Sequence, residues 1–389
     1  MNTKIFKKGT KGITLIALVV SIVVLLILAG VTLRIVINNN IVEKSQNAVA
    51  KYKEHADAEQ ALLNKLSVEI ATQGVNADTY NTDKHVNKPQ LSAGMIPIKY
   101  KNNSWVICAE DDTEWYNYQT KNYANVMLSD GTYKGETAVV GQTVADTELG
   151  SMFVWIPRYA YSIKEYKIAK NGEGTTQNIT DVTFLVGTSN KDESGKSYAT
   201  DYDISKVEVG SPTPAIVHPA FNFGGTNLNG LWCAKFEASS QQITENSNTV
   251  NVIKVAPNTA SWRSINVGNI FLTCLDMKNK SVYGLSTSDD THMMKNTEWG
   301  AIAYLAASQY GVTPTKNSSS SYLTGEGAYK TNTSQSTTGD VTGIYDLNGG
   351  AWEYVAAYWD NGDSNISGQG TTTVFPSNSL ASTYTKYWD

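Results

Sequence analysis

Cysteine is scarce in this 389-residue chain, and its scarcity excludes one class of metal site. The three cysteines are Cys108, Cys233 and Cys274. They are far apart and form no C-x-x-C pair, so a structural zinc site is not expected. If this part of the chain lies outside the cell, two of the cysteines could form a disulfide and the third would remain a free thiol. We favour three unpaired, partly buried cysteines, because a free cysteine usually behaves as a small apolar residue.

Charge and arginine are also low. Charged residues make up 17% of the chain, and the net charge is −5 with a pI near 5.5. The only arginines are Arg34, Arg158 and Arg263. A nucleic-acid-binding chain normally shows a basic face, so we expect no nucleic-acid partner. The chain is instead rich in Ser, Thr, Asn, Gly and Tyr, a composition typical of short strands joined by long polar loops.

The N-terminus predicts a membrane location. Four lysines precede a run from Ile13 to Leu33 in which 21 residues carry no charge. As a helix this run would span roughly 31 Å, close to the hydrocarbon thickness of a bilayer. The excess of lysine before the run predicts the N-terminus inside and the rest of the chain outside, as a single-pass protein of a prokaryotic cell surface.

The residues that begin this run are more specific. Lys11-Gly12-Ile13-Thr14-Leu15-Ile16 resembles the cleavage signal of type IV prepilins and pseudopilins. The resemblance implies cleavage between Gly12 and Ile13 by a prepilin peptidase, methylation of the new N-terminus, and possible contact with other pilins. Most members of that family carry glutamate at the fifth mature position, where this chain has Ala17. We therefore expect processing rather than assembly as a principal fibre subunit, with an uncleaved signal anchor as the alternative.

Four regions follow from the sequence patterns. Apolar residues recur at helical steps from Ile41 to Thr72, which predicts that the membrane helix continues as an amphipathic stalk. Beyond the stalk we expect strands over 104–109, 151–156 and 231–237, and helices over 260–276 and 297–309. The regions are a leader at 1–12, a transmembrane helix and stalk at 13–74, a polar linker at 75–94, and a domain at 95–389.

Four segments of the last region carry a resemblance to a known family. The sharpest is Gly343-Ile344-Tyr345-Asp346-Leu347-Asn348-Gly349-Gly350-Ala351-Trp352-Glu353-Tyr354, and the others are Phe153–Pro157, Leu231–Glu237 and Lys295–Gly300. In this order they resemble the formylglycine-generating enzyme (sulfatase-modifying factor) family, a branch of the C-type-lectin-like fold. The expected fold class is therefore α+β: a long N-terminal transmembrane and stalk helix, then a C-type-lectin-like ectodomain of short strands, about two helices and long loops.

The motif at 343–354 also predicts a cation. Asp346 and Glu353 are oxygen donors on either side of two glycines, an arrangement that suits calcium. The resemblance implies a structural Ca²⁺ on Asp346, Gly349, Ala351 and Glu353, the middle two through main-chain oxygens. The alternative is that Asp346 caps a turn and Glu353 pairs with a lysine. We expect the aromatic residues Tyr345 and Trp352 to lie in the core.

Catalysis is not expected. The oxidases of the resembled family need a cysteine pair near the C-terminus, and no cysteine follows Cys274 here. His218 and His292 stand alone, without the histidine cluster of the iron-dependent relatives. The closing strands of the family are not recognisable before Asp389, so we expect a domain cut short at its C-terminus, which would weaken the argument from missing cysteines.

The sequence thus favours a non-catalytic binding or adhesion module displayed at the cell surface, with an unknown protein or glycan ligand. A minor pilin or pseudopilin of a pilus or secretion machine is the first alternative, and a formylglycine-generating-type oxidase is the second. Two aromatic stretches, Trp115–Tyr118 and Tyr354–Trp359, are candidate contact surfaces. Packing in the core is an equally good interpretation of these aromatic residues.

Overall fold

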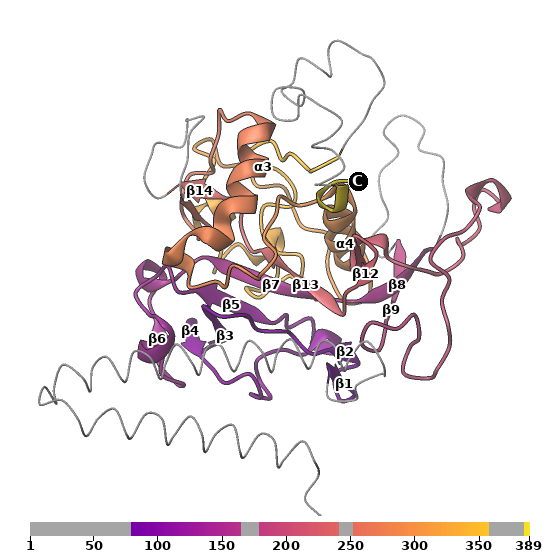
Figure 1. The fold of residues 1–389 in the computed structure, drawn as a ribbon, viewed down its shortest axis with the longest axis horizontal. Coiled ribbons are helices and arrows are strands. Elements are labelled where there is room, and N and C mark those ends of the chain that lie inside the picture. The colour runs from indigo at the N-terminus through magenta and orange to yellow at the C-terminus, as the bar shows by residue number, and fades with distance from the viewer. Residues whose placement is uncertain (1–78, 165–178, 241–251, 358–384) are drawn as a thin grey trace, which may run out of the picture. The chain divides into compact units, whose positions relative to one another are not determined.

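The computed structural model describes residues 79–164, 179–240, 252–357 and 385–389, which belong to the unit Gly74–Asp389. At the centre of this unit is a six-stranded antiparallel sheet with the order β13-β7-β5-β3-β4-β6 (Figure 1). Its strands are β3 (Met95–Lys101), β4 (Ser104–Ile107), β5 (Asn125–Leu128), β6 (Thr143–Val144), β7 (Met152–Pro157) and β13 (Gly230–Ala234).

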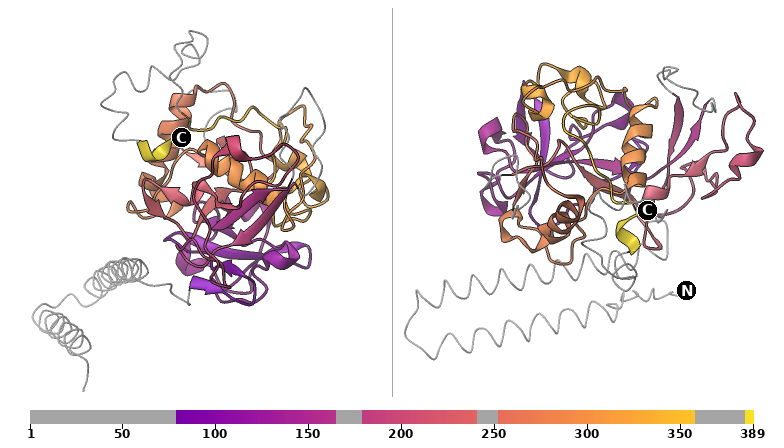
Figure 2. Two further views of the ribbon diagram at one scale, coloured as in Figure 1. Left: turned by 90° about the vertical axis from the view of Figure 1, so that its right-hand side faces the viewer. Right: turned by 90° about the horizontal axis from the view of Figure 1, so that it is seen from above.

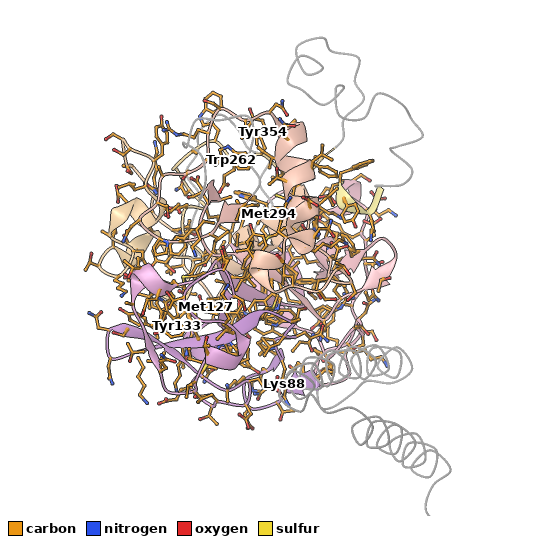
Figure 3. The ribbon with its side chains drawn as sticks, turned by 60° about the vertical axis from the view of Figure 1, so that its left-hand side comes forward. Lys88, Met127, Tyr133, Trp262, Met294 and Tyr354 are labelled. Atoms are coloured by element: carbon orange, nitrogen blue, oxygen red, sulfur yellow. The ribbon has the colours of Figure 1, made fainter. Side chains whose placement is uncertain are left out.

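Turn chemistry and burial explain the middle of this sheet. Asn102 and Asn103 join β3 to β4 with φ of 52° and 61°, a left-handed conformation that asparagine tolerates better than most residues. This two-residue turn fixes the register that pairs Lys101 with Ser104. All four residues of β5 are buried, so the central strand is covered on both faces. Side chains fill the space around the sheet, among them Met127 of β5 (Figure 3).

A smaller antiparallel sheet has the order β10-β8-β9. Its strands are β8 (Tyr159–Ile163), β9 (Thr180–Phe184) and β10 (Ile216–Val217). Arg158 separates β7 from β8 and is buried, and it donates to the carbonyls of Ser189 and Phe221. This one side chain therefore ties distant loops to the junction between the two sheets. The two-residue strand pairs are β1 (Tyr80–Asn81) with β2 (Val86–Asn87), β11 (Asn222–Phe223) with β12 (Thr226–Asn227), and β14 (Ser239–Ser240) with β15 (Ile253–Lys254).

Two α-helices, α3 (Val267–Asp276) and α4 (Asn296–Ala306), lie on one side of the six-stranded sheet (Figures 1 and 2). The Asn266 side chain accepts the N–H of Asn269 at 2.9 Å and so begins α3. Glu298 accepts the N–H of Lys295 at 2.8 Å at the start of α4. The apolar face of α4 enters the main core, with Ala301, Ile302 and Leu305.

The expected strands are confirmed as β4, β7 and β13, and the expected helices as α3 and α4. β7 is shifted by one residue from its predicted range, and the other four elements are shorter than predicted. Part of the expected polar linker, from residue 79 onward, holds β1 and β2. Within it Val86 is completely buried, and the Asn87 side chain donates to the carbonyls of Gly187 and Asn229. These residues therefore belong to the packed domain.

The expected fold class is wrong. In place of an α+β fold with a long N-terminal transmembrane helix and a C-type-lectin-like ectodomain, the described residues form a sheet-rich structure with two short α-helices. At 10 and 11 residues, α3 and α4 reach only about 15–17 Å, roughly half the thickness of a bilayer core. Among the residues that the structure describes, no helix is long and apolar enough to cross a membrane. The predicted segments 1–12 and 13–74 lie outside the described residues.

Candidate functional site

The loop after Tyr345 is built from backbone conformations that favour small or amide-like residues. Tyr345 is buried and donates its hydroxyl to the Tyr329 carbonyl at 2.7 Å. Asp346 follows with φ of 64°, and Gly349 and Gly350 have φ of 91° and 71°. A Cβ on Gly349 would overlap the Asn317 carbonyl, and one on Gly350 would overlap the Glu237 carboxylate. The loop therefore requires both glycines.

Asp346 holds this loop to two other segments. Its side chain is buried, and Oδ1 accepts hydrogen bonds from Asn317 Nδ2 at 2.8 Å and from the Gly325 N–H at 2.9 Å. Burial raises the pKa of the Asp346 carboxyl, and its hydrogen bonds act in the opposite direction. The carboxylate thus acts as an acceptor that closes the turn.

Glu237, which follows β13, supports the loop from a second position. Its carboxylate accepts the N–H of Ala351 at 2.9 Å and the Ser261 hydroxyl. The pKa of Glu237 is raised to about 8, first by burial and then by the negative charges of Asp346 and Glu353, while the hydrogen bonds to Ser261 and Ala351 act in the opposite direction. The two carboxylates, Asp346 and Glu237, leave little freedom for the main chain between residues 346 and 351.

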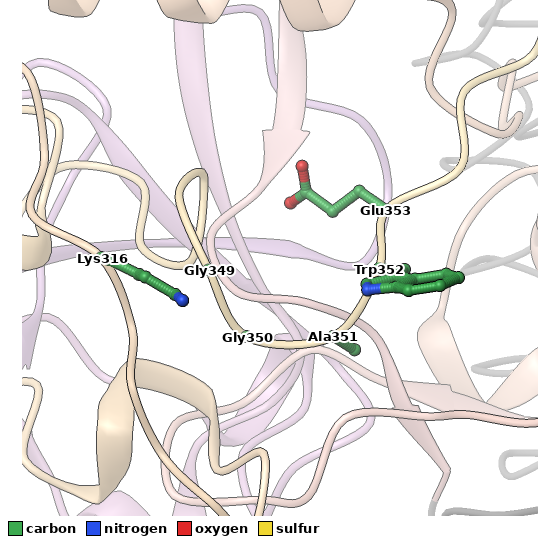
Figure 4. A pocket seen from close by; sticks show the side chains of 6 residues that line it. All are labelled: Lys316, Gly349, Gly350, Ala351, Trp352 and Glu353. Atoms are coloured by element: carbon green, nitrogen blue, oxygen red, sulfur yellow. The ribbon is translucent and has the colours of Figure 1, made fainter. Parts of the chain in front are cut away.

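An open hollow of about 470 Å³ lies over this loop (Figure 4). It is lined by Lys316, Gly349, Gly350, Ala351, Trp352 and Glu353. Trp352 is 92% exposed, and its indole extends outward from the loop. By contrast, Trp105, Trp115 and Trp155 are no more than 2% exposed. An indole in solvent adds little to the core, and it offers an aromatic plane with an N–H donor to a ligand.

Glu353 is the acidic group of the hollow. Its Oε2 accepts a hydrogen bond from Trp299 Nε1 of α4 at 2.9 Å. The pKa of Glu353 is raised to about 7, first because protein atoms displace water from around the carboxyl and then because of the Asp346 charge. Solvent still reaches much of the side chain. Near neutral pH Glu353 can therefore either donate or accept a hydrogen bond.

The four residues predicted to hold calcium do not all face this hollow. Gly349, Ala351 and Glu353 line it, but Asp346 is buried below the loop with its carboxylate turned to Asn317 and Gly325. N–H donors occupy positions where a cation would have to sit on Asp346. In the described ranges no group of three or more His, Cys, Asp or Glu side chains is arranged to hold a metal. Calcium binding at these four residues stays a prediction.

The outcomes for the other predicted functional residues are mixed. Gly12 and Ile13 lie outside the described residues. Tyr345 lies in the core as expected, whereas Trp352 does not. The aromatic residues of Trp115–Tyr118 are all buried, so this stretch packs and offers no contact surface. Sequence reasoning missed Lys316 and Asn317, because their loop carries no motif and meets the 346–353 segment only through the fold.

The three cysteines are free thiols, and Lys235 is buried. Burial raises the pKa of Cys108 and of Cys274 to about 12, and raises that of Cys233 as well, so all three stay protonated thiols. Burial lowers the pKa of Lys235, whose ammonium donates to the carbonyls of Val341 at 2.6 Å and Gly343 at 2.7 Å. These contacts make Lys235 an internal link between β13 and the segment that precedes the hollow.

A second charged cluster surrounds His292. Its Nδ1 lies 2.7 Å from Asp290 Oδ1, and its Nε2 lies 3.0 Å from Glu298 Oε1. Burial lowers the pKa of His292, but the hydrogen bonds and charges of the two carboxylates outweigh this effect and raise it to about 9. The ring also stacks on Phe223 with centroids 4.9 Å apart. Both imidazole nitrogens are thus engaged, Nε2 with Glu298 of α4 and Nδ1 with Asp290 in the segment before it, which is a structural role.

No protein-family profile matches this chain, and no curated protein matches it. The class that the fold and site define is structural: a sheet-rich domain that presents the exposed indole of Trp352 beside an open hollow.

Proposed function

We propose that this chain is a non-catalytic binding module displayed at the cell surface, and that the hollow at Gly349–Glu353 is its contact site. The observation that carries the proposal is the 92% exposure of Trp352 on a loop that two carboxylates hold from beneath. A rigid aromatic side chain offers a large contact area and loses little conformational entropy on binding. The Lys-rich leader and the apolar run Ile13–Leu33 support location at a membrane.

Adherence of the cells that make the protein tests this proposal. Cells producing the wild-type chain and cells producing Trp352→Ala are compared for binding to like cells and to mucin-coated and collagen-coated wells. We expect protease added outside intact cells to remove the domain, and the Trp352→Ala cells to adhere less. A domain that stays protected from protease, or equal adherence of the two strains, contradicts the proposal.

A minor pilin or pseudopilin is the second candidate, because Lys11-Gly12-Ile13 is similar to a prepilin cleavage signal. It requires processing by a prepilin peptidase. Mass spectrometry of the mature N-terminus separates the outcomes: a chain that starts at Ile13 supports processing, and a chain that starts at Met1 excludes it. Loss of Trp352 would leave pilin assembly unchanged, which separates this candidate from the adhesion proposal.

A further inference from the structure

The hollow combines an aromatic plane with polar groups of both kinds. Lys316 brings an ammonium donor, and its side chain points toward the loop in Figure 4. Glu353 brings a carboxyl group to the lining, and one of its oxygens already accepts a hydrogen bond from Trp299 Nε1. Next to both stands the exposed indole of Trp352. A ligand that fits must therefore be apolar on one face and rich in hydrogen-bonding groups at its rim.

The main chain adds further acceptors. No donor among the described residues hydrogen-bonds the carbonyl oxygens of Gly349, Gly350 or Ala351. The N–H groups of Gly350 and Ala351 donate to the Asn317 carbonyl and to the Glu237 carboxyl group. These two donors hold the loop, and the three carbonyl oxygens keep their acceptor capacity for a ligand.

We propose that this hollow binds a neutral glycan, with the C–H face of one pyranose ring stacked on Trp352. The hydroxyl groups of the ring would donate to the free carbonyls and to Glu353 and accept from Lys316. This inference names the ligand of the site in the proposed function and rests on that proposal. Hydroxyl groups suit the site because each can donate and accept, as the mixture of partners requires.

Other ligand classes fit less well. A nucleic acid could stack a base on Trp352, but Lys316 is the one cation of the lining, and the chain carries a net charge of −5. An acidic glycan would bring its negative charge next to the acidic side chain of Glu353, and Lys316 alone in the lining could offset that charge. An apolar peptide side chain normally occupies a deeper, mostly apolar pocket, whereas this hollow is open and half polar.

The test uses the full-length chain, purified in a detergent without a sugar headgroup. Isothermal titration calorimetry and tryptophan fluorescence are measured with soluble cellohexaose, chitohexaose, xylohexaose and mannohexaose. We expect at least one hexaose to bind with Kd between about 10 μM and 1 mM. Trp352→Ala should weaken that binding by about tenfold or more, and Trp352→Phe by less, because phenylalanine keeps an aromatic plane.

Val140→Ala is the control, since Val140 is also an exposed apolar side chain, at 62%, but does not line the hollow. Its affinity should equal that of the wild type, and near-UV circular dichroism should show Trp352→Ala to be folded. Absence of binding by all four hexaoses, or equal affinity of Trp352→Ala and wild type, overturns the glycan inference. If Trp352→Ala still abolishes cell adherence in that case, the binding module stands with another ligand. If adherence is unchanged as well, both proposals fail.

Discussion

Replacing Asp346 by alanine removes the acceptor on which the loop at the hollow depends. Two buried N–H donors lose their partner, Asn317 Nδ2 at 2.8 Å and the Gly325 N–H at 2.9 Å. A buried donor left without an acceptor costs about 1–3 kcal/mol. Alanine also has to adopt the φ of 64° that Asp346 has, which adds about 1–2 kcal/mol. The expected loss is therefore about 3–8 kcal/mol of unfolding free energy.

Asp346→Asn is the matched control. Asparagine tolerates the left-handed conformation and keeps one carbonyl acceptor, so we expect it to lose only about 1–2 kcal/mol. Urea unfolding of the full-length chain, followed by tryptophan fluorescence, measures both variants against the wild type. An Asp346→Ala protein within about 1 kcal/mol of wild type would refute the hydrogen-bonding role.

The same pair of variants separates that role from the predicted calcium site. If Asp346 only closes the turn, the stability difference between wild type and Asp346→Asn is the same in EGTA and in millimolar calcium. If Asp346 is a calcium ligand, added calcium stabilises the wild type selectively and the difference widens, because a ligand stabilises the state that binds it. We expect no widening, since N–H donors already occupy the carboxylate.

Three further predictions concern pH and the loop. The pKa of Glu237 is about 8 in the folded chain and near 4.5 in the unfolded chain. Between these two pH values the folded chain therefore keeps a proton that the unfolded chain has lost. Stability should therefore fall as pH rises from about 5 to 8, and Glu237→Gln should flatten that slope in urea titrations. The pKa of His292 is raised from 6.5 to about 9, so its stabilisation is complete below pH 6.5 and is lost as pH rises through 9. His292→Gln should remove this loss at high pH, and a variant with the wild-type pH profile would contradict it. Gly349→Ala should lower stability by about 2 kcal/mol or more, because its φ is 91° and a Cβ would overlap the Asn317 carbonyl; an unchanged urea midpoint would count against the strain.

Much of the secondary structure could be predicted from local patterns. The apolar runs that became β4, β7 and β13, and the alanine-rich run that became α4, are visible in the sequence because burial and pairing act on neighbouring residues. The architecture could not be predicted in the same way. Motif resemblance suggested a lectin-like α+β ectodomain, but the strand order of a sheet depends on contacts between segments far apart, which short motifs do not specify.

By itself the sequence determined the chemistry available at the loop: two glycines that permit left-handed turns, acids at 346 and 353, and an indole at 352. Only the tertiary structure decided how that chemistry is used. It buried Asp346 against Asn317 and Gly325, placed Glu237 beneath Ala351, and left Trp352 in solvent. The physical reason is that exposure and hydrogen-bond partners are properties of neighbours in space. For this loop those neighbours come from positions 29 and 114 residues away in the chain.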